Sequence, residues 1–117
     1  MDDKLRNYDL SYLEELSAGD TAFIKSIISQ FVAETPDVIA NIKASTLQHN
    51  WALLNSLMHK FASSLSFIGL NEINEDVKKV ENSSKNLSEL AEIPALIDKI
   101  VERCEIAIDW LKKDFEL

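Results

Sequence analysis

The sequence predicts an all-α protein: an up-down-up-down antiparallel four-helix bundle with a short N-terminal cover helix. Two observations lead to this prediction. The 117 residues include only 2 Gly and 2 Pro, whereas a sheet protein of this size needs many tight turns that consume those residues. Apolar residues also recur at helical spacing between short polar stretches. Few long elements joined by short loops make sequential helices antiparallel neighbours.

The first predicted element is a short helix over 8–16, in which Leu10, Leu13 and Leu16 recur at helical spacing. A long helix follows, capped by Asp20 or Thr21 and running to about residue 45. Its apolar positions span a wide arc: Phe23, Ile24, Ile27, Ile28, Phe31 and Val32. Such an arc predicts cover on two sides, and the short helix is the expected second cover.

Three polar breaks divide the rest of the chain, at 48–50, 69–71 and 82–88. Pro36 predicts a kink within the long helix, and Asn50 is the expected cap of a helix over 51–68. The next helix is expected over 72–84, with an apolar stripe of Ile73, Val77, Val80 and Leu87. The last begins between Ser88 and Pro94 and ends near Phe115, since proline is tolerated in a first turn. Its inward positions are Ile93, Leu96, Ile97, Ile100, Val101, Cys104, Ile108 and Leu111.

Composition limits the class of function. A formal charge of -8, from 12 Lys+Arg against 20 Asp+Glu, makes nucleic acid and an anionic membrane poor partners. The single Cys104 allows no internal disulfide, which fits a reducing compartment. No apolar run approaches the roughly 20 residues of a membrane helix, and the first residues, MDDKLRNYD, contain no hydrophobic signal core. We expect one cytoplasmic, monomeric domain over 1–117.

The helix over 51–68 separates an apolar stripe from one isolated histidine. At 100° per residue, the stripe falls within about 120° of arc and contains Leu53, Leu54, Leu57, Phe61, Leu65 and Ile68. His59 lies about 165° from its centre and is expected to point to solvent. The residues on its face are small, and none is Lys, Glu or Arg: Ala52, Asn55, Ser56, Ala62, Ser63 and Ser66.

A lone imidazole on a smooth face suits a phosphoryl acceptor. Imidazole is nucleophilic and largely neutral near pH 7, and small neighbours would let a second protein bring a reacting atom up to it. His49, by contrast, sits in a polar turn without a motif and is not expected to be functional.

Residues 59–69 resemble the motif of the histidine phosphotransfer (HPt) domain family, which reads His, any residue, Leu, Lys, Gly, with a further Gly ten positions after the His. His59, the apolar Phe61 and Gly69 match this pattern. Val80 and Glu81 resemble the Leu-Glu pair on the family's following helix. The resemblance covers essentially the whole chain, including the bundle and the cover helix.

Two positions depart from the motif. Ala62 replaces the family's Lys, which helps to hold the phosphoryl group, and Ser63 replaces the first Gly. Lys60 is adjacent but lies about 100° further round the helix. A tight loop at Gly69 would bring residues near 81 level with His59, and Lys78 or Lys85 would then be able to reach over.

The resemblance implies a phosphorelay intermediate. His59 would accept a phosphoryl group from the aspartyl-phosphate of one receiver domain and pass it to another, while Lys60, Ala62, Ser63, Ser66 and Gly69 would support the site or the docking surface. The expected partners are response-regulator receivers, including those of a hybrid sensor histidine kinase. Mg²⁺ would be bound by the receiver and no cofactor by this chain. With no glycine-rich phosphate loop, the chain is expected to be a carrier without an ATP site, standing alone or cut from such a kinase.

Two other functions stay open: a helical module that docks a receiver or a partner helix and transfers nothing, and a purely structural bundle. Four further residues are expected to be structural. Cys104 falls on a core stripe, and Trp51 and Trp110 lie near helix ends. Phe67 lies off its helix's core arc and is expected to pack on the cover helix or the following helix, with an exposed partner contact as the alternative.

Overall fold

The computed structural model describes residues 6–117. The predicted domain 1–117 and the segment MDDKLRNYD both begin with residues 1–5, which lie outside the described residues. The described chain forms five α-helices: α1 (Ser11–Leu16), α2 (Thr21–Leu47), α3 (Trp51–Ile68), α4 (Asn74–Asn86) and α5 (Ile93–Asp114). Single 3₁₀ turns, Asn71–Ile73 and Leu90–Glu92, precede α4 and α5. Residues 6–117 contain no strand, so the all-helical prediction is confirmed.

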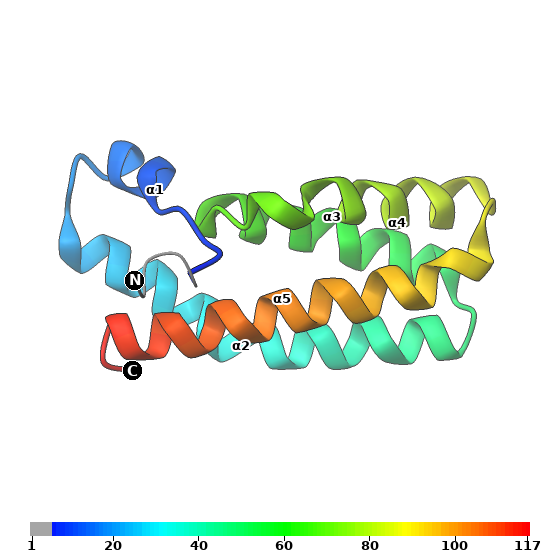
Figure 1. The fold of residues 1–117 in the computed structure, drawn as a ribbon. Coiled ribbons are helices and arrows are strands. Elements are labelled where there is room, and N and C mark those ends of the chain that lie inside the picture. Colours follow the sequence, from blue (N-terminus) through cyan, green and yellow to red (C-terminus); the bar gives the residue numbers. More distant parts are fainter. Residues whose placement is uncertain (1–5) are drawn as a thin grey trace.

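Each long helix packs against its neighbours in the chain, and α5 also packs against α2. Figure 1 shows α2, α3, α4 and α5 running alternately in opposite directions along one axis, with the C-terminus at the end of the molecule that carries α1. The interior between them is apolar, and its largest fully buried side chains include Ile42, Leu54, Leu65 and Ile100. None of the helices in residues 6–117 is long and apolar enough to cross a membrane.

The two predicted caps begin α2 and α3. The Asp20 carboxylate accepts hydrogen bonds from the backbone N–H groups of Ala22 and Phe23, and the Asn50 side chain accepts one from Leu53. These bonds satisfy donors that a helix start leaves without partners. The helix α2 continues through Pro36, whose side chain is exposed, and the expected kink there stays a prediction.

Leu16 and Leu87 do not lie where the sequence predicts. Leu16 is 54% exposed and Leu87 is 64% exposed. The first lies at the end of the six-residue α1, from which Leu13 alone is buried. The second ends α4 in a left-handed conformation with φ 55°, which turns its side chain out of the apolar stripe. The short helix α1 also packs mainly on α3 rather than on α2, and Phe23 of α2 remains 41% exposed.

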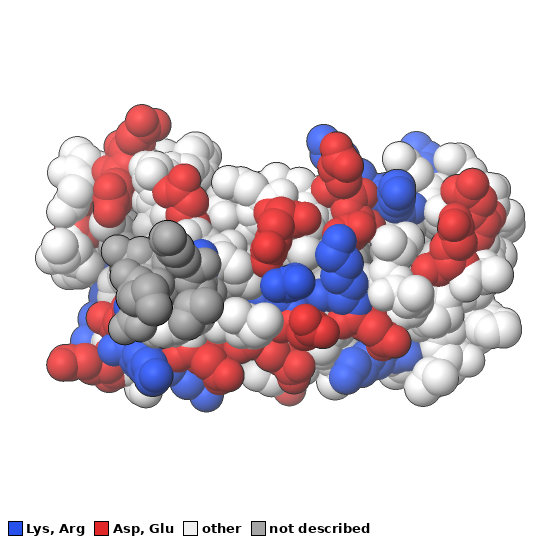
Figure 2. Space-filling model, in the orientation of Figure 1, with Lys and Arg blue, Asp and Glu red and all other residues white. Residues whose placement is uncertain are grey.

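Charge is spread over the surface. On the face drawn in Figure 2, acidic and basic side chains are interspersed, and its described residues form no continuous basic area. Ion pairs also join neighbouring helices, including Lys99 of α5 with Asp76 of α4 at 3.1 Å. This face therefore gives no basic footprint of the kind that a nucleic-acid backbone requires.

Candidate functional site

The buried apolar stripe of α3 is rotated slightly about the helix axis relative to the predicted stripe. Its buried residues are Leu54, Met58, Phe61, Leu65 and Ile68. Met58 replaces Leu53, which is 44% exposed, and Leu57 is only half-buried. The centre of the stripe shifts accordingly, and His59 lies about 140° from it, on the flank of α3 that borders α4.

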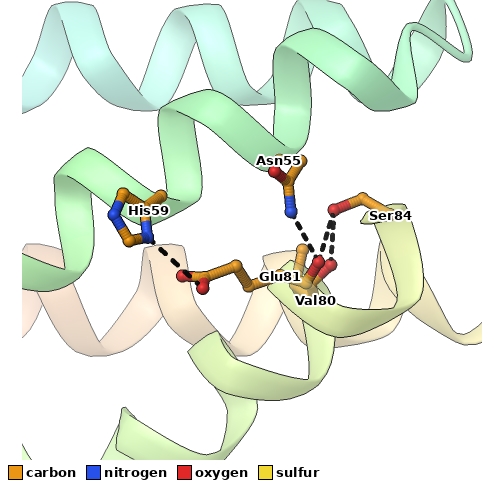
Figure 3. Close-up of polar contacts among 5 residues, drawn as sticks. All are labelled: Asn55, His59, Val80, Glu81 and Ser84. Carbon is orange, nitrogen blue, oxygen red and sulfur yellow. Dashed lines mark hydrogen bonds and ion pairs between the residues drawn. The ribbon is translucent and has the colours of Figure 1, made fainter. Parts of the chain in front are cut away.

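His59 is exposed, as predicted, but it is not alone. Its side chain is 78% accessible, and Nδ1 lies 3.4 Å from Oε2 of Glu81 on α4. A carboxylate can only accept a hydrogen bond, so the pair is a hydrogen bond when Nδ1 carries the proton. The neutral ring then has a free lone pair on Nε2, which points away from Glu81 in Figure 3.

Glu81 is held by its backbone as well as by its side chain. Asn55, one turn before His59 on α3, donates from Nδ2 to the Glu81 carbonyl oxygen at 2.7 Å. The Ser84 hydroxyl contacts the same oxygen at 3.0 Å and the Val80 carbonyl at 2.8 Å. Figure 3 shows these contacts beside the His59–Glu81 pair. Residues near 81 thus lie level with His59, as the tight loop at Gly69 predicted.

Sequence reasoning missed two of these roles. The sequence identifies Glu81 only through its resemblance to a family pair, and it predicts Asn55 among the small residues of an open face. The available signal was their spacing: Asn55 precedes His59 by four residues, so both share one face of α3. The rotation that turns this face toward α4 depends on packing, which the sequence does not display.

Small side chains do surround His59 on its own helix. Ala52, Ser56, Ser63 and Ser66 are exposed, whereas Ala62 is half-buried against the core. The Ser66 hydroxyl donates to the Ala62 carbonyl at 3.0 Å, which keeps its side chain close to the helix surface. Small exposed residues therefore lie before and after His59 along α3, as the sequence predicts.

A hollow of about 430 Å³ begins one turn beyond His59. It is lined by Tyr12, Ser63, Ser66, Phe67 and Asn71. The Tyr12 and Phe67 rings lie 5.8 Å apart between centroids, so the half-buried Phe67 packs on the cover helix α1, as expected. This hollow joins α1 to the serine face of α3.

The cation that Ala62 fails to supply has no clear substitute in the described structure. Lys60, Lys78 and Lys85 are all exposed. Lys78 and Lys85 lie one turn before and one turn after Glu81 on α4, and neither makes a hydrogen bond or ion pair within the described residues. Their reach toward His59 stays a prediction.

Gly69 ends α3 in a left-handed conformation with φ 73°, which costs glycine little and other residues more. It is also buried beneath the N-terminal segment, where the Asp9 amide donates to the Ile68 carbonyl at 3.2 Å. Gly69 therefore ends α3 beneath the N-terminal segment and is not exposed at the surface on which a partner would dock.

The structure places the other residues that were not expected to be functional in ring contacts or in the core: His49, Trp51, Trp110 and Cys104. His49 stacks on Trp51, with ring centroids 5.2 Å apart, and the Arg6 guanidinium lies 4.3 Å from the Trp110 ring centroid. Cys104 is fully buried, and burial raises the pKa of its thiol to about 12, which makes it unreactive.

Comparison with known families and proteins gives one result. The sequence model of a family described as the Hpt domain matches residues 26–108, which include α3, α4 and the His59–Glu81 pair. No curated protein and no solved structure matches significantly.

Proposed function

The chain belongs to the Hpt domain family, whose members carry phosphoryl groups on histidine in two-component phosphorelays, and we propose on this premise that His59 is the phosphoryl acceptor. The observation that carries the proposal is the orientation of His59. Its ring is 78% accessible and its Nδ1 faces a carboxylate, so Nε2 is available to an incoming group. His49, stacked on Trp51 in a turn, has no such arrangement.

The reaction is a reversible exchange between a receiver aspartate and His59. The Nε2 lone pair attacks phosphorus, the N–P bond forms, and the bond from phosphorus to the aspartate oxygen breaks, which releases the carboxylate. The ring becomes cationic while Nδ1 keeps its proton, and the Glu81 carboxylate stabilises that positive charge. Attack by the aspartate of a second receiver reverses these steps. Phosphoryl transfer depends largely on positioning and electrostatics, so a small carrier is sufficient.

The docking surface that we propose extends from His59 to Ser63, Ser66 and the hollow beside α1. Small exposed side chains there are compatible with the close approach that transfer requires. The receiver would supply the acidic pocket and Mg²⁺. Lys60, Lys78 and Lys85 are the candidate cations for the phosphoryl group, with Ala62 in the place of the family lysine.

The proposal also includes the oligomeric state, the cellular location, the partners and the framework of the carrier. The chain would act as a monomeric cytoplasmic carrier without an ATP site, served by receivers that include those of a hybrid sensor kinase. Its framework would be the up-down-up-down four-helix bundle with a cover helix, which the contacts between successive helices support. The rigid placement of His59 on the 18-residue α3 suits a carrier with two successive partners.

A phosphorylated receiver provides the direct test. Mixing it with this chain is expected to produce acid-labile, base-stable phosphate on the wild type and on His49→Gln, but none on His59→Gln. ATP with Mg²⁺ alone is expected to label none of the three. Labelling that persists in His59→Gln and disappears in His49→Gln would contradict the assignment.

The second candidate is a module that docks a receiver without transfer, and Ala62 favours it because the family lysine is missing. The two functions differ in one measurement. A docking module would bind the phosphorylated receiver, as measured by titration calorimetry, without acquiring phosphate on His59 or accelerating the loss of phosphate from the receiver.

A further inference from the structure

Two residues one turn apart on α3 contact Glu81, one at its backbone and one at its carboxylate. Asn55 and His59 are separated by four positions and therefore share one helix face. The first bonds the Glu81 backbone carbonyl at 2.7 Å, and the second contacts the Glu81 carboxylate at 3.4 Å. Figure 3 shows both contacts on the same side of α3.

The His59–Glu81 contact is too weak to determine its own geometry. The side chains of His59 and Glu81 are 78% and 29% accessible, and their separation is at the long end of the range for hydrogen bonds. Exposed pairs of this kind add little to stability, because forming them costs side-chain conformational entropy. A further interaction is therefore needed to keep the carboxylate opposite Nδ1.

The Asn55 bond is suited to that task. It is short, half-buried, and joins two helices through a backbone atom of Glu81 itself. It therefore fixes the rotation and the register of α4 at the residue whose side chain faces the histidine. The other side-chain bonds near this carbonyl come from Ser84, within α4, and leave the position of α4 relative to α3 unchanged.

We propose that Asn55 is a positioning residue that holds Glu81 opposite Nδ1 of His59 and thereby keeps His59 in the tautomer with Nε2 free. It touches neither the phosphoryl group nor the receiver and acts only through Glu81. The role in phosphotransfer rests on the proposed function, whereas the effect on the tautomer does not.

The chemistry of the amide makes the proposal specific. Asn55 donates an N–H to a carbonyl oxygen, so Asn55→Ala removes the bond, and Asn55→Asp places an acceptor against an acceptor at nearly equal volume. Asn41, exposed on α2 and without a side-chain hydrogen bond in the described structure, provides the matched control Asn41→Ala.

The first measurement is the tautomer of each histidine in the intact chain, obtained from the ¹⁵N chemical shifts of the ring at alkaline pH. We expect His59 to favour the Nδ1–H tautomer in the wild type and in Asn41→Ala. In Asn55→Ala and Asn55→Asp it is expected to shift toward the Nε2–H tautomer, while His49 remains unchanged as an internal reference. A wild-type tautomer in both Asn55 variants would overturn the proposal.

The second measurement is the rate of His59 phosphorylation by phosphoramidate, which needs no docked receiver. Asn55→Ala is expected to lower this rate about three- to tenfold, the range that the loss of one hydrogen bond produces. In a Glu81→Gln background the same change is expected to have little further effect, since Asn55 acts through the carboxylate. An equal loss in both backgrounds would indicate a merely structural role and overturn the proposal. If the wild type accepts no phosphate, the proposed function fails, and the tautomer comparison alone decides the role of Asn55.

Discussion

Asp9 crosses directly over Gly69, so closely that a Cβ on the glycine would overlap the Asp9 carbonyl group. The Asp9 amide also donates to the carbonyl of the preceding Ile68. The segment before α1 is therefore seated on the end of α3, and this contact fixes where α1 begins. From there α1 packs on α3 and lines the hollow beside the serine face.

Replacing Gly69 with Ala is expected to destabilise the protein more than the same change at Gly19. Both glycines have positive φ, of 73° and 78°, and a left-handed alanine costs about 1–2 kcal/mol. A Cβ at Gly19 meets nothing within 4 Å, so this variant measures the backbone cost alone. The extra loss at Gly69 then measures the displacement of Asp9, and urea unfolding compares the two. Equal losses would show that the segment over Gly69 moves without cost.

Met58 and His59 are expected to respond in opposite ways to substitution. Met58 is fully buried, so Met58→Ala is expected to cost about 2–5 kcal/mol of unfolding free energy. His59→Gln removes an exposed side chain and is expected to change stability by no more than about 0.5 kcal/mol. Chemical unfolding of both variants checks the rotation of α3. A small effect at Met58 together with a large one at His59 would contradict it.

Helical spacing predicted most of the fold, because the apolar periodicity and the caps act locally. It was wrong where packing or backbone conformation overrides the pattern. Leu87 fits a helical stripe by spacing, yet it adopts φ 55° and ends α4. Leu53 fits the stripe of α3, but Met58 takes the buried place, since the rotation of a helix depends on which neighbours it packs against.

The exposed part of the candidate site could be predicted from the sequence, whereas its contacts between helices could not. His59 and the small residues after it could be found because exposure follows from the wheel of a single helix. Asn55 also appeared to be a small surface residue. Its bond to Glu81 joins positions 26 residues apart, and it depends on the register of two helices that the sequence of neither helix specifies.

Stability is expected to fall at both extremes of pH through the contacts of Asp114. The Arg6 guanidinium, with Oδ1 of Asp114 at 2.7 Å, and a hydrogen bond from Tyr8 lower the pKa of Asp114 to about 2. The unfolded value is about 3.9. This group therefore contributes stability above about pH 4, and that contribution is lost as the pH falls through about 2.

Burial, together with the hydrogen bond to Asp114, raises the pKa of Tyr8 to about 12. Its contribution is complete below the ordinary value of about 10 and is lost as the pH rises through about 12. Thermal unfolding midpoints measured across pH report the acid limb and the alkaline limb of the curve of stability against pH. Asp114→Asn is expected to flatten the acid limb and Tyr8→Phe the alkaline one, each relative to the wild type. Unaltered limbs in both variants would show that the N-terminal segment is not docked on α5.

The docking surface can be tested at Ser63 and Ser66, which lie one and two turns beyond His59. Both are exposed and both line the hollow beside α1, so Ser63→Arg and Ser66→Arg are expected to leave the helical content unchanged, since arginine is a good helix former. A receiver that brings its aspartate to Nε2 from the side of the hollow would cover these serines. A bulky cation there is expected to slow transfer from the receiver at least tenfold, the effect of losing about 1.4 kcal/mol of binding.

Phosphoramidate separates docking from chemistry, because a small donor reaches His59 without covering the serines. Its rate with Ser63→Arg and Ser66→Arg is expected to stay within about twofold of the wild type, less than the loss of a single hydrogen bond produces. Ser56→Arg is a matched control, since Ser56 is exposed on the same helix but lies one turn before His59, away from the hollow. The informative quantity is the ratio of the receiver rate to the phosphoramidate rate in each variant. A ratio that falls at Ser63 and Ser66 and stays constant at Ser56 places the receiver over the hollow and α1. A constant ratio in all three variants would mean that the receiver approaches His59 from another side, and the small residues beyond His59 would then have no part in docking.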